Sequence, residues 1–280
     1  MTTLIIGGSG KTGQSLAKLL KAANRPALLT SRSGNMPEAF KAVAFDWVDP
    51  TTFENPFKVD PSIDRVYLIA PRVANMFEVV KPFIDLAISK GTKRFVFLSA
   101  SQVQPGDPNL GQIHQYLIDM RVDYTVLRPT WFIQNFATNL AYGIKEKSEI
   151  FSATGEGKIP LVAVEDIAQA AFEVLTAEKS PNRDYFLVGP ELWSYDEVAK
   201  LMSSVLGREI KHMKVEEEER KQVFIRNGIP SDLASRLAQM EVRVAHGSEA
   251  KYFDESADRK IVGKHTLREF VEANRAVWMK

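Results

Sequence analysis

The first half of the chain alternates short apolar segments with segments whose apolar residues recur at helical spacing. The apolar segments lie at residues 2–6, 27–30, 41–45, 65–69, 94–98 and 123–127. Several are continuous runs of β-branched and aromatic residues, which is typical of strands covered on both faces of a sheet. Helical spacing is found at residues 12–23, 77–89 and 113–120. This alternation predicts an α/β fold with a Rossmann-type, doubly wound parallel sheet and right-handed crossovers.

The second half of the chain is predicted to be mainly helical. Helices are expected at residues 167–176, 195–206, 216–226, 231–240 and 267–278. A strand at residues 185–188 is expected to rejoin the sheet. Ser194 and Glu197 have the spacing of a capping box at the start of one of these helices. We therefore expect one continuous unit with a Rossmann core over residues 1–150 and a smaller, mixed lobe over residues 151–280.

Composition excludes several kinds of chemistry. The 280 residues include no cysteine, so disulfides, a thiol nucleophile and a cysteine metal site are excluded. The four histidines lack helical ligand spacing, and no metal site is expected. The formal net charge of +1 gives no broad field for a nucleic acid or an anionic membrane. Without a secretory leader or an apolar run of membrane length, the chain is expected to be cytoplasmic.

A glycine-rich turn follows the first apolar segment directly. It consists of Gly7, Gly8, Ser9, Gly10, Lys11, Thr12 and Gly13. The first glycine of the G-x-x-G-x-x-G spacing allows a tight turn, the second lets the backbone approach a pyrophosphate, and the third lets the helix pack closely. The helix start adds unpaired N–H groups and the positive end of its dipole. The pattern predicts a dinucleotide-binding turn.

A nucleoside triphosphate loop is excluded at this turn. That motif requires a glycine five residues before the Gly-Lys pair, and Ile5 occupies that position. The end of the second strand carries no acidic residue to bind a ribose 2′-hydroxyl. We expect Arg32 to bind a 2′-phosphate instead, with Ser31 and Lys11 assisting. The sequence therefore predicts NADP(H) rather than NAD(H).

With its later segments, the chain resembles the NmrA-like branch of the atypical short-chain dehydrogenases/reductases. The shared segments are residues 7–13, 97–101, 124–136 and 164–168. Within that branch it is similar to the fungal ergot-alkaloid reductases of the festuclavine and agroclavine dehydrogenase type. The segments that carry this similarity are residues 45–47, 111–114, 127–132, 152–160, 189–192 and 276–278. The resemblance spans nearly the whole chain and implies a small indole-alkaloid substrate.

The resemblance also implies which residues contact the cofactor, all of them at the carboxyl ends of strands. The 2′-phosphate is expected at Thr30, Ser31 and Arg32, and the adenine at Asp46 and Trp47. The nicotinamide ribose is expected at Ala70 and Pro71. The nicotinamide end is expected at Pro129, Thr130 and Trp131, and Ser99 is also expected to bind the cofactor.

The usual proton donor of this enzyme class is missing. Short-chain dehydrogenases that reduce ketones resemble one another in a Tyr-x-x-x-Lys pair, whereas here Tyr116 is followed four residues later by Met120. Ser99 and Ser101 lie near the usual serine of the family, but serine alone is a poor acid. His114 is a candidate acid, and its alternative role is that of a hydrogen-bonded residue at a helix start.

An iminium substrate removes the need for an acid, because hydride addition to its carbon yields a neutral amine. An aromatic face is expected to stabilise the cation, with Trp131 the first candidate and Phe132 and Tyr116 the others. We therefore predict an NADPH-dependent reductase of an iminium or imine in fungal indole-alkaloid biosynthesis.

Two alternatives remain open from the sequence. The first is an NADP(H)-binding enzyme that catalyses a non-redox rearrangement, such as opening an indole epoxide to a spirooxindole. It would need an acid or base, for which His114, Lys158 and Glu165 are the candidates. The second is an NADP-sensing regulatory protein that binds a protein partner. The sequence makes no prediction of the oligomeric state.

Overall fold

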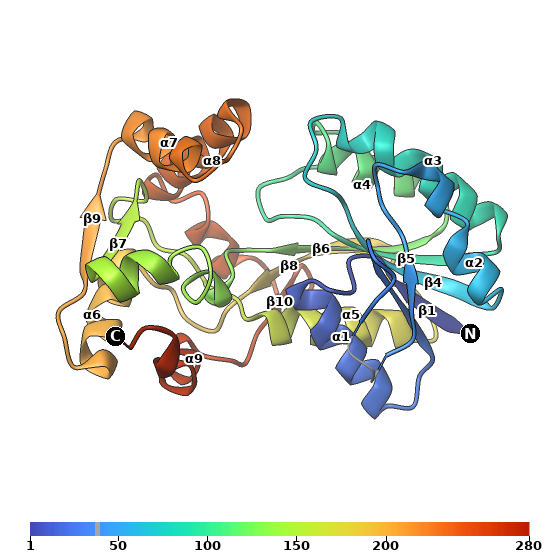
Figure 1. The fold of residues 1–280 in the computed structure, drawn as a ribbon, viewed down its shortest axis with the longest axis horizontal. Helices are drawn as coiled ribbons and strands as arrows, with labels where there is room; N and C mark the ends of the chain where they lie inside the picture. The colour runs from blue at the N-terminus through green and yellow to red at the C-terminus, as the bar shows by residue number, and fades with distance from the viewer. Residues whose placement is uncertain (37–39, 280) are drawn as a thin grey trace. The chain divides into compact units, whose positions relative to one another are not determined.

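The computed structural model describes residues 1–36 and 40–279 (Figure 1). The chain forms two compact units. Unit 1 contains Met1–Pro129 and Val164–Leu187, and unit 2 contains Thr130–Ala163 and Val188–Lys280. This division differs from the expected boundary at residue 150, because the segment after Ala163 supplies a further helix and strand to unit 1. Within the described residues, no helix is long and apolar enough to cross a membrane.

Unit 1 is built on a parallel sheet, which confirms the predicted fold class. Its strands lie in the order β8-β6-β5-β4-β1-β2-β3, and each neighbouring pair is parallel. The order from β3 to β6 is that of a Rossmann sheet. The strands are β1 (Thr2–Ile5), β2 (Ala27–Ser31), β3 (Ala42–Ala44), β4 (Ile63–Ile69), β5 (Arg94–Leu98), β6 (Asp123–Pro129) and β8 (Arg183–Val188).

Helices cover both faces of this sheet. Figure 1 shows α1 and α5 on one face and α3 and α4 on the other. Because both faces of the sheet are covered, strand residues such as Leu4, Val66 and Phe95 are fully buried. The unbroken apolar runs of the strands predict this arrangement. The helices of the unit are α1 (Lys11–Ala22), α2 (Asn55–Val59), α3 (Met76–Ser89), α4 (Leu110–Asp119) and α5 (Val164–Thr176), with a 3₁₀ turn at Pro50–Thr52.

The carboxyl end of α5 is capped by a buried charge at the start of β5. The guanidinium of Arg94, 4% exposed, donates to the carbonyl oxygens of Val174 and Ala177 at 3.1 and 2.6 Å, and to that of Glu178 at 3.2 Å. These carbonyls lack partners within the helix, so the cation satisfies them and complements the helix dipole. The returning segment is thereby fixed to the sheet of unit 1.

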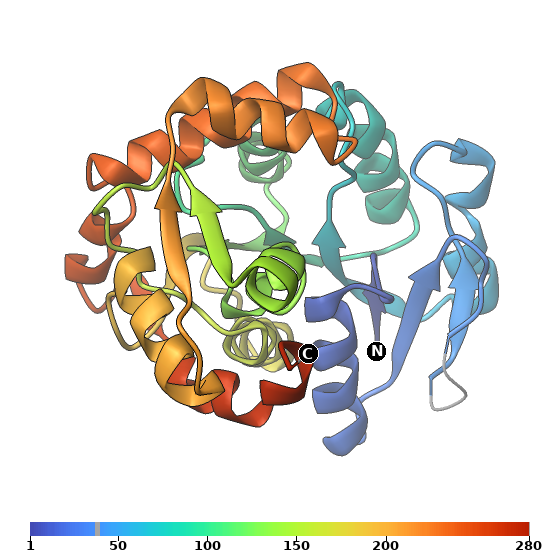
Figure 2. The same cartoon turned by 60° about the vertical axis from the view of Figure 1, so that its left-hand side comes forward.

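Unit 2 combines helices with a second, two-stranded parallel sheet. Strands β7 (Glu149–Ser152) and β9 (Lys211–Lys214) lie side by side, as Figure 2 shows in green and orange. The remaining elements are α6 (Tyr195–Leu206), α7 (Glu217–Arg226), α8 (Ser231–Ala245), β10 (Lys260–Val262) and α9 (Leu267–Ala273). Single turns lie at Ile133–Asn135, Gly143–Lys147, Ala250–Asp254 and Arg275–Val277.

Two buried anchors organise unit 2. Trp278 is fully buried and donates its indole N–H to the carbonyl of Phe136 at 2.9 Å. The ion pair between Arg220 and Glu241, 2.8 Å apart, joins α7 to α8, and Glu241 also accepts the backbone N–H of Ala153 at 2.8 Å. Such a pair is held in register by its hydrogen bonds, because an unpaired buried charge is strongly unfavourable. The α7–α8 hairpin is therefore tied to the segment that follows β7.

Candidate functional site

The glycine-rich turn has the geometry that its spacing predicts. Gly7 has a φ of +76°, in the left-handed region that favours glycine. The backbone N–H of Gly10 donates to the carbonyl of Gly7 at 2.8 Å, which closes the turn. Gly10 is the N-cap of α1 and brings no capping side chain. The first N–H groups of the helix are therefore available to an anion.

Gly13 and Gly8 stand where no side chain fits. A Cβ at Gly13 would lie 2.6 Å from the carbonyl oxygen of Gly7, and one at Gly8 would lie 2.8 Å from the Cβ of Leu29. These approaches are shorter than atoms tolerate, so both residues must remain glycine if the backbone is to stay in place. Gly13 thus lets the helix pack closely on the turn itself.

Thr30 supports the turn from beneath. It is buried, and its hydroxyl accepts the N–H of Gly7 at 3.2 Å and donates to the carbonyl of Ile5 at 3.3 Å. The two residues after it are more open. Ser31 is partly exposed and donates to the carbonyl of Asn35 at 3.0 Å, and Arg32 is exposed. Of the three residues expected at a 2′-phosphate, the structure thus gives Thr30 a role within the turn.

A second cation lies near Lys11. Burial lowers the pKa of Lys11, and the charge of Arg72 lowers that pKa further. Arg72 is exposed and directly follows Ala70 and Pro71, beyond the carboxyl end of β4. Because β4 is the parallel neighbour of β1, it ends at the same sheet edge as the glycine-rich turn. Arg72 was not predicted from the sequence, although its place after a strand end was a usable signal.

Trp47 links the ends of β3 and β4. Its indole N–H donates to the carbonyl of Ile69 at 3.2 Å, and its ring packs edge-on against Phe45 and Phe83. The carboxylate of Asp46 accepts the N–H of Val48 at 3.1 Å. Both residues expected at the adenine therefore lie after β3 in a fixed local conformation.

Backbone hydrogen bonds connect the segment after β5 to the end of β6. The N–H of Ser99 donates to Leu127 at 2.8 Å, and that of Ser101 donates to Pro129 at 3.0 Å. Buried Arg128 holds the same segment, because it donates to the carbonyl of Ser101 at 2.8 Å. The hydroxyl of Ser99 is buried and has no hydrogen-bond partner among the described residues. Ser99 thus offers a polar group that nothing in residues 1–36 or 40–279 satisfies.

His114 lies in the interior of unit 1. It is 1% exposed, and its ring lies 6.3 Å from that of Tyr124. Burial lowers its pKa to about 4, with Asp184 opposing and Arg128 adding to the shift. Its Nδ1 has no hydrogen-bond partner in the described part of the chain. The expectation of a hydrogen-bonded residue at a helix start is therefore wrong for Nδ1, which is buried without a partner in that part of the chain. A neutral imidazole of this kind is a poor proton donor near neutral pH.

Tyr116 is held by two charged residues of a different helix. Its hydroxyl donates to Asp85, and Lys81 lies 4.9 Å from the centre of its ring and 2.7 Å from the same carboxylate. Burial and the hydrogen bond to Asp85 raise the pKa of Tyr116. The structure therefore places a lysine, Lys81, beside Tyr116, although the local sequence motif has no lysine. The carboxylate that accepts this hydrogen bond makes the hydroxyl a weaker acid.

In unit 2, Thr130 and Trp131 are fixed to the segment around Pro160. The hydroxyl of Thr130 donates to the carbonyl of Pro160 at 2.5 Å, and the carbonyl of Trp131 accepts the N–H of Val162 at 2.9 Å. The partly exposed ring of Trp131 meets that of Tyr195 edge-on, with 6.3 Å between centres. These hydrogen bonds connect Trp131, the predicted aromatic contact, to the end of the segment of residues 152–160.

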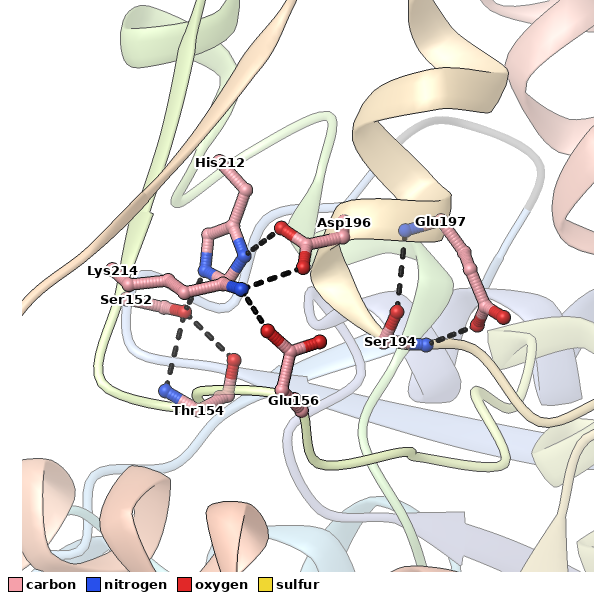
Figure 3. Close-up of polar contacts among 8 residues, drawn as sticks. All are labelled: Ser152, Thr154, Glu156, Ser194, Asp196, Glu197, His212 and Lys214. Atoms are coloured by element: carbon pink, nitrogen blue, oxygen red, sulfur yellow. Dashed lines mark hydrogen bonds and ion pairs between the residues drawn. The ribbon is translucent and has the colours of Figure 1, made fainter.

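A polar cluster in unit 2 was not anticipated. Figure 3 shows Ser152, His212 and Asp196 linked in a row, with Lys214 beside Asp196. These residues come from β7, β9 and α6, and no local motif joins them. The same view shows the predicted capping box of Ser194 and Glu197, whose two hydrogen bonds of 3.2 and 2.8 Å confirm it. Lys158, a candidate acid or base, pairs with Glu197 at 2.8 Å.

Solved structures of known proteins share this fold. A triphenylmethane reductase from Citrobacter sp., solved as a complex with NADP(H), is 20% identical with a TM-score of 0.73 over 97% of this chain and 95% of that one. An NADPH-dependent quinone oxidoreductase from Escherichia coli, solved with NADPH, is 21% identical with a TM-score of 0.74 over 97% of this chain and 99% of that one.

Curated relatives are much more similar in sequence. An agroclavine dehydrogenase from Claviceps fusiformis is 41% identical over 286 residues, covering 100% of this chain and 99% of the relative. A festuclavine dehydrogenase from Aspergillus fumigatus is 38% identical and covers 100% of both chains. These matches confirm the predicted resemblance to the ergot-alkaloid reductases. The model of the NmrA-like family matches residues 1–271, and the chain belongs to the NmrA-like family.

Proposed function

We propose that this protein is an NADPH-dependent oxidoreductase that reduces the carbon–nitrogen double bond of an iminium or imine in fungal indole-alkaloid biosynthesis. The agroclavine and festuclavine dehydrogenases among its relatives support the substrate class. The proposal has two parts, a cofactor site in unit 1 and a substrate-facing aromatic residue in unit 2.

The residues of unit 1 fit a dinucleotide phosphate. Gly10 and Gly13 leave the start of α1 open to a pyrophosphate, and Lys11 and Arg72 place two positive charges near it. Exposed Arg32, at the end of a strand without an acidic residue, is the candidate partner of the 2′-phosphate. When bound, NADPH supplies the hydride. The NADP(H) complexes of proteins with the same fold support this choice.

The observation that carries the iminium assignment is that the candidate acids are buried or already paired. His114 is buried and neutral, Tyr116 donates to Asp85, and Lys158 forms an ion pair with Glu197. A ketone would require one of them to protonate the alkoxide. An iminium requires none, because the hydride and its electron pair add to the carbon while the electrons of the double bond return to nitrogen. Holding and orienting the substrate then provides most of the catalysis.

Trp131 is the proposed contact for the cationic substrate. Trp131 is partly exposed, its carbonyl accepts the N–H of Val162, and the preceding residue, Thr130, donates to Pro160. A cation over an indole face gains about 0.5–2 kcal/mol, depending on how far it is desolvated. Trp131 is therefore expected to bind and orient the iminium and to take no part in proton transfer.

The test is to mix the purified protein with NADPH and a cyclic indole iminium, and to follow NADPH absorbance together with product mass. Loss of one NADPH for each amine formed supports the proposal, and a ketone of similar shape should not be reduced. Product without loss of NADPH would replace reduction by a rearrangement. Inertness toward all such compounds, with a protein partner captured in an NADP-dependent manner, would indicate a regulator.

A further inference from the structure

A continuous row of hydrogen bonds crosses unit 2 (Figure 3). His212 Nδ1 lies 2.9 Å from Asp196 Oδ1, and His212 Nε2 lies 2.8 Å from the hydroxyl oxygen of Ser152. The Ser152 hydroxyl lies 2.8 Å from that of Thr154. Lys214 Nζ lies 2.8 Å from the second oxygen of Asp196 and also contacts Glu156. We refer to Thr154, Ser152, His212 and Asp196 as the His212 chain.

For a neutral imidazole, the chemistry of the groups sets the direction of each hydrogen bond in this chain. Burial would raise the pKa of Asp196, but hydrogen bonds from Lys214 and His212 outweigh it, and the carboxylate stays ionised and only accepts. Nδ1 of His212 must then donate, which leaves Nε2 of the neutral ring as an acceptor. The Ser152 hydroxyl donates to Nε2 and in turn accepts from Thr154. Burial lowers the pKa of His212 and favours this neutral state.

The arrangement resembles the Ser-His-Asp order of hydrolytic enzymes, but its burial excludes that chemistry. Ser152 and Thr154 are fully buried, and the His212 side chain is 1% exposed. A nucleophile must reach its substrate, and the Ser152 hydroxyl has no open side. The chain therefore acts by holding other residues in place.

The His212 chain is connected to Trp131 through the residues that surround it. The ring of Tyr195, the neighbour of Asp196 in sequence, meets His212 at 5.7 Å and Trp131 at 6.3 Å, both edge-on. Ser152 also begins the segment whose other end, at Pro160 and Val162, is bonded to Thr130 and Trp131. Two routes within unit 2, one through a buried ring and one through the backbone, thus connect His212 to Trp131.

We propose that His212 is a positioning residue that fixes the Trp131 ring for the substrate, so that loss or protonation of His212 raises the substrate KM. This inference rests on the proposed function only in assigning Trp131 to the substrate. The connection between the two rings stands on the contacts within unit 2. Mutations along such connected elements change coupling by about 0.5–2 kcal/mol, which corresponds to about 2- to 30-fold.

We expect acid to protonate His212 and so to change the hydrogen bonds of the His212 chain. The charged groups that face the imidazole act on this protonation in both directions. Asp196 and Glu156 favour the imidazolium, whereas Lys214 opposes it. Asp196 and His212 also border a surface groove of about 620 Å³, whose other charged residues are Lys200, Glu209 and Lys211. Burial lowers the pKa of His212, and the hydrogen bond to Asp196 opposes that shift. On protonation Nε2 becomes a donor, so the Ser152 hydroxyl must turn and accept from Nε2 where it had donated to it.

The test uses fluorine NMR of the full chain labelled with 5-fluorotryptophan, which gives one signal for each of the four tryptophans. Trp131→Phe assigns the Trp131 signal, and Trp47 in unit 1 serves as the internal reference. In the unaltered protein the Trp131 signal should shift on acidification below about pH 6.5, the ordinary pKa of histidine. In His212→Gln that shift should disappear, while His246→Gln, which changes an exposed histidine, should retain it.

Kinetics supply the second readout. His212→Gln should raise the substrate KM about fivefold, with kcat and the Kd for NADPH changed less than twofold. Asp196→Asn keeps an acceptor for Nδ1, so it should raise the substrate KM less than His212→Gln does. Should His212→Gln fail to fold, Ser152→Ala removes the Nε2 partner and keeps the ring.

An unchanged Trp131 titration in both His212→Gln and Ser152→Ala would overturn the inference. So would a fall in kcat at constant KM. Because the NMR experiment needs no turnover, a protein that reduces no iminium would refute the proposed function without deciding the coupling between His212 and Trp131.

Discussion

The glycine-rich turn of unit 1 and the His212 chain of unit 2 are built in opposite ways. The turn consists of seven consecutive residues, supported by Thr30 of the neighbouring strand, and it acts through backbone groups that side chains must not obstruct. The His212 chain collects residues from β7, α6 and β9, up to 60 positions apart, and it is held together by hydrogen bonds between side chains. A phosphate site can therefore remain constant in local sequence. The His212 chain depends instead on long-range packing, which single substitutions can change.

The largest expected effect tests whether the turn requires glycine, which has no side chain, at position 13. Gly13→Val would drive a side chain into the carbonyl of Gly7, so the turn must move away from its phosphate-binding geometry. We expect NADPH binding to weaken at least about 100-fold, or about 2.7 kcal/mol, in fluorescence titration. Lys18→Ala, a change at an exposed position of the same helix, should bind normally. Tight binding by a folded Gly13→Val protein would contradict the assigned role of the turn.

Arg32 tests whether a side chain adds cofactor selectivity to this backbone site. Charge-assisted hydrogen bonds contribute about 1.5–3 kcal/mol, so Arg32→Gln should weaken NADPH binding about 30-fold and leave NADH binding nearly unchanged. Arg25→Gln, at another exposed arginine, is the matched control. An equal loss for both cofactors would place Arg32 at the shared pyrophosphate and remove it from the 2′-phosphate.

The buried histidine of unit 1 predicts a pH-dependent stability that is separate from the His212 chain. The pKa of His114 is lowered to about 4, whereas in the unfolded chain it is about 6.5. The unfolded state then binds more protons between these values, so stability is complete above about pH 6.5 and falls as the pH approaches 4. At pH 5 the loss should be about 2 kcal/mol, measured by urea unfolding against pH 7.

His114→Gln should remove this part of the slope, whereas His246→Gln should retain it. An unchanged slope in His114→Gln would show that His114 is not the group responsible. Any slope that survives in His114→Gln and disappears in the double variant with His212→Gln belongs to unit 2.

The smallest expected effect concerns Tyr116, which an acid-dependent mechanism would need. Because its hydroxyl is bound to Asp85, Tyr116→Phe should change kcat for an iminium less than twofold. Loss of a general acid would instead lower kcat by about 100- to 10,000-fold. A fall of that size, measured by NADPH oxidation at saturating substrate, would break the account of a reaction without a proton donor.

Features with a local sequence signal were predicted from the sequence. Strand β5 and helix α6 have the expected bounds, and the capping box of α6 and the geometry of the glycine-rich turn are confirmed. Each depends on residues within one turn or strand. The last predicted helix ends early, at Ala273, because the Asn274 side chain bonds back to Phe270 and a 3₁₀ turn follows.

Features that depend on distant partners were not predicted. Strand β9 reads Lys-His-Met-Lys, without the apolar alternation that marks a strand, and it is defined by its pairing with β7. The approach of Lys81 to Tyr116 arises from two packed helices and leaves no motif in either. The return of a strand at residues 185–188 to the sheet was predicted, but the discontinuous unit 1, in which residues 164–187 join residues 1–129, follows from tertiary structure.

The central claim is that a hydride from NADPH is added to an iminium carbon without a protein acid. It is tested most directly with NADPH deuterated at C4 and a cyclic indole iminium, analysed by mass spectrometry and NMR of the amine. The account predicts one deuterium at the former iminium carbon, on a single face, with equal transfer by the Tyr116→Phe variant. An amine without deuterium, or product formed with the label still on the cofactor, would contradict it.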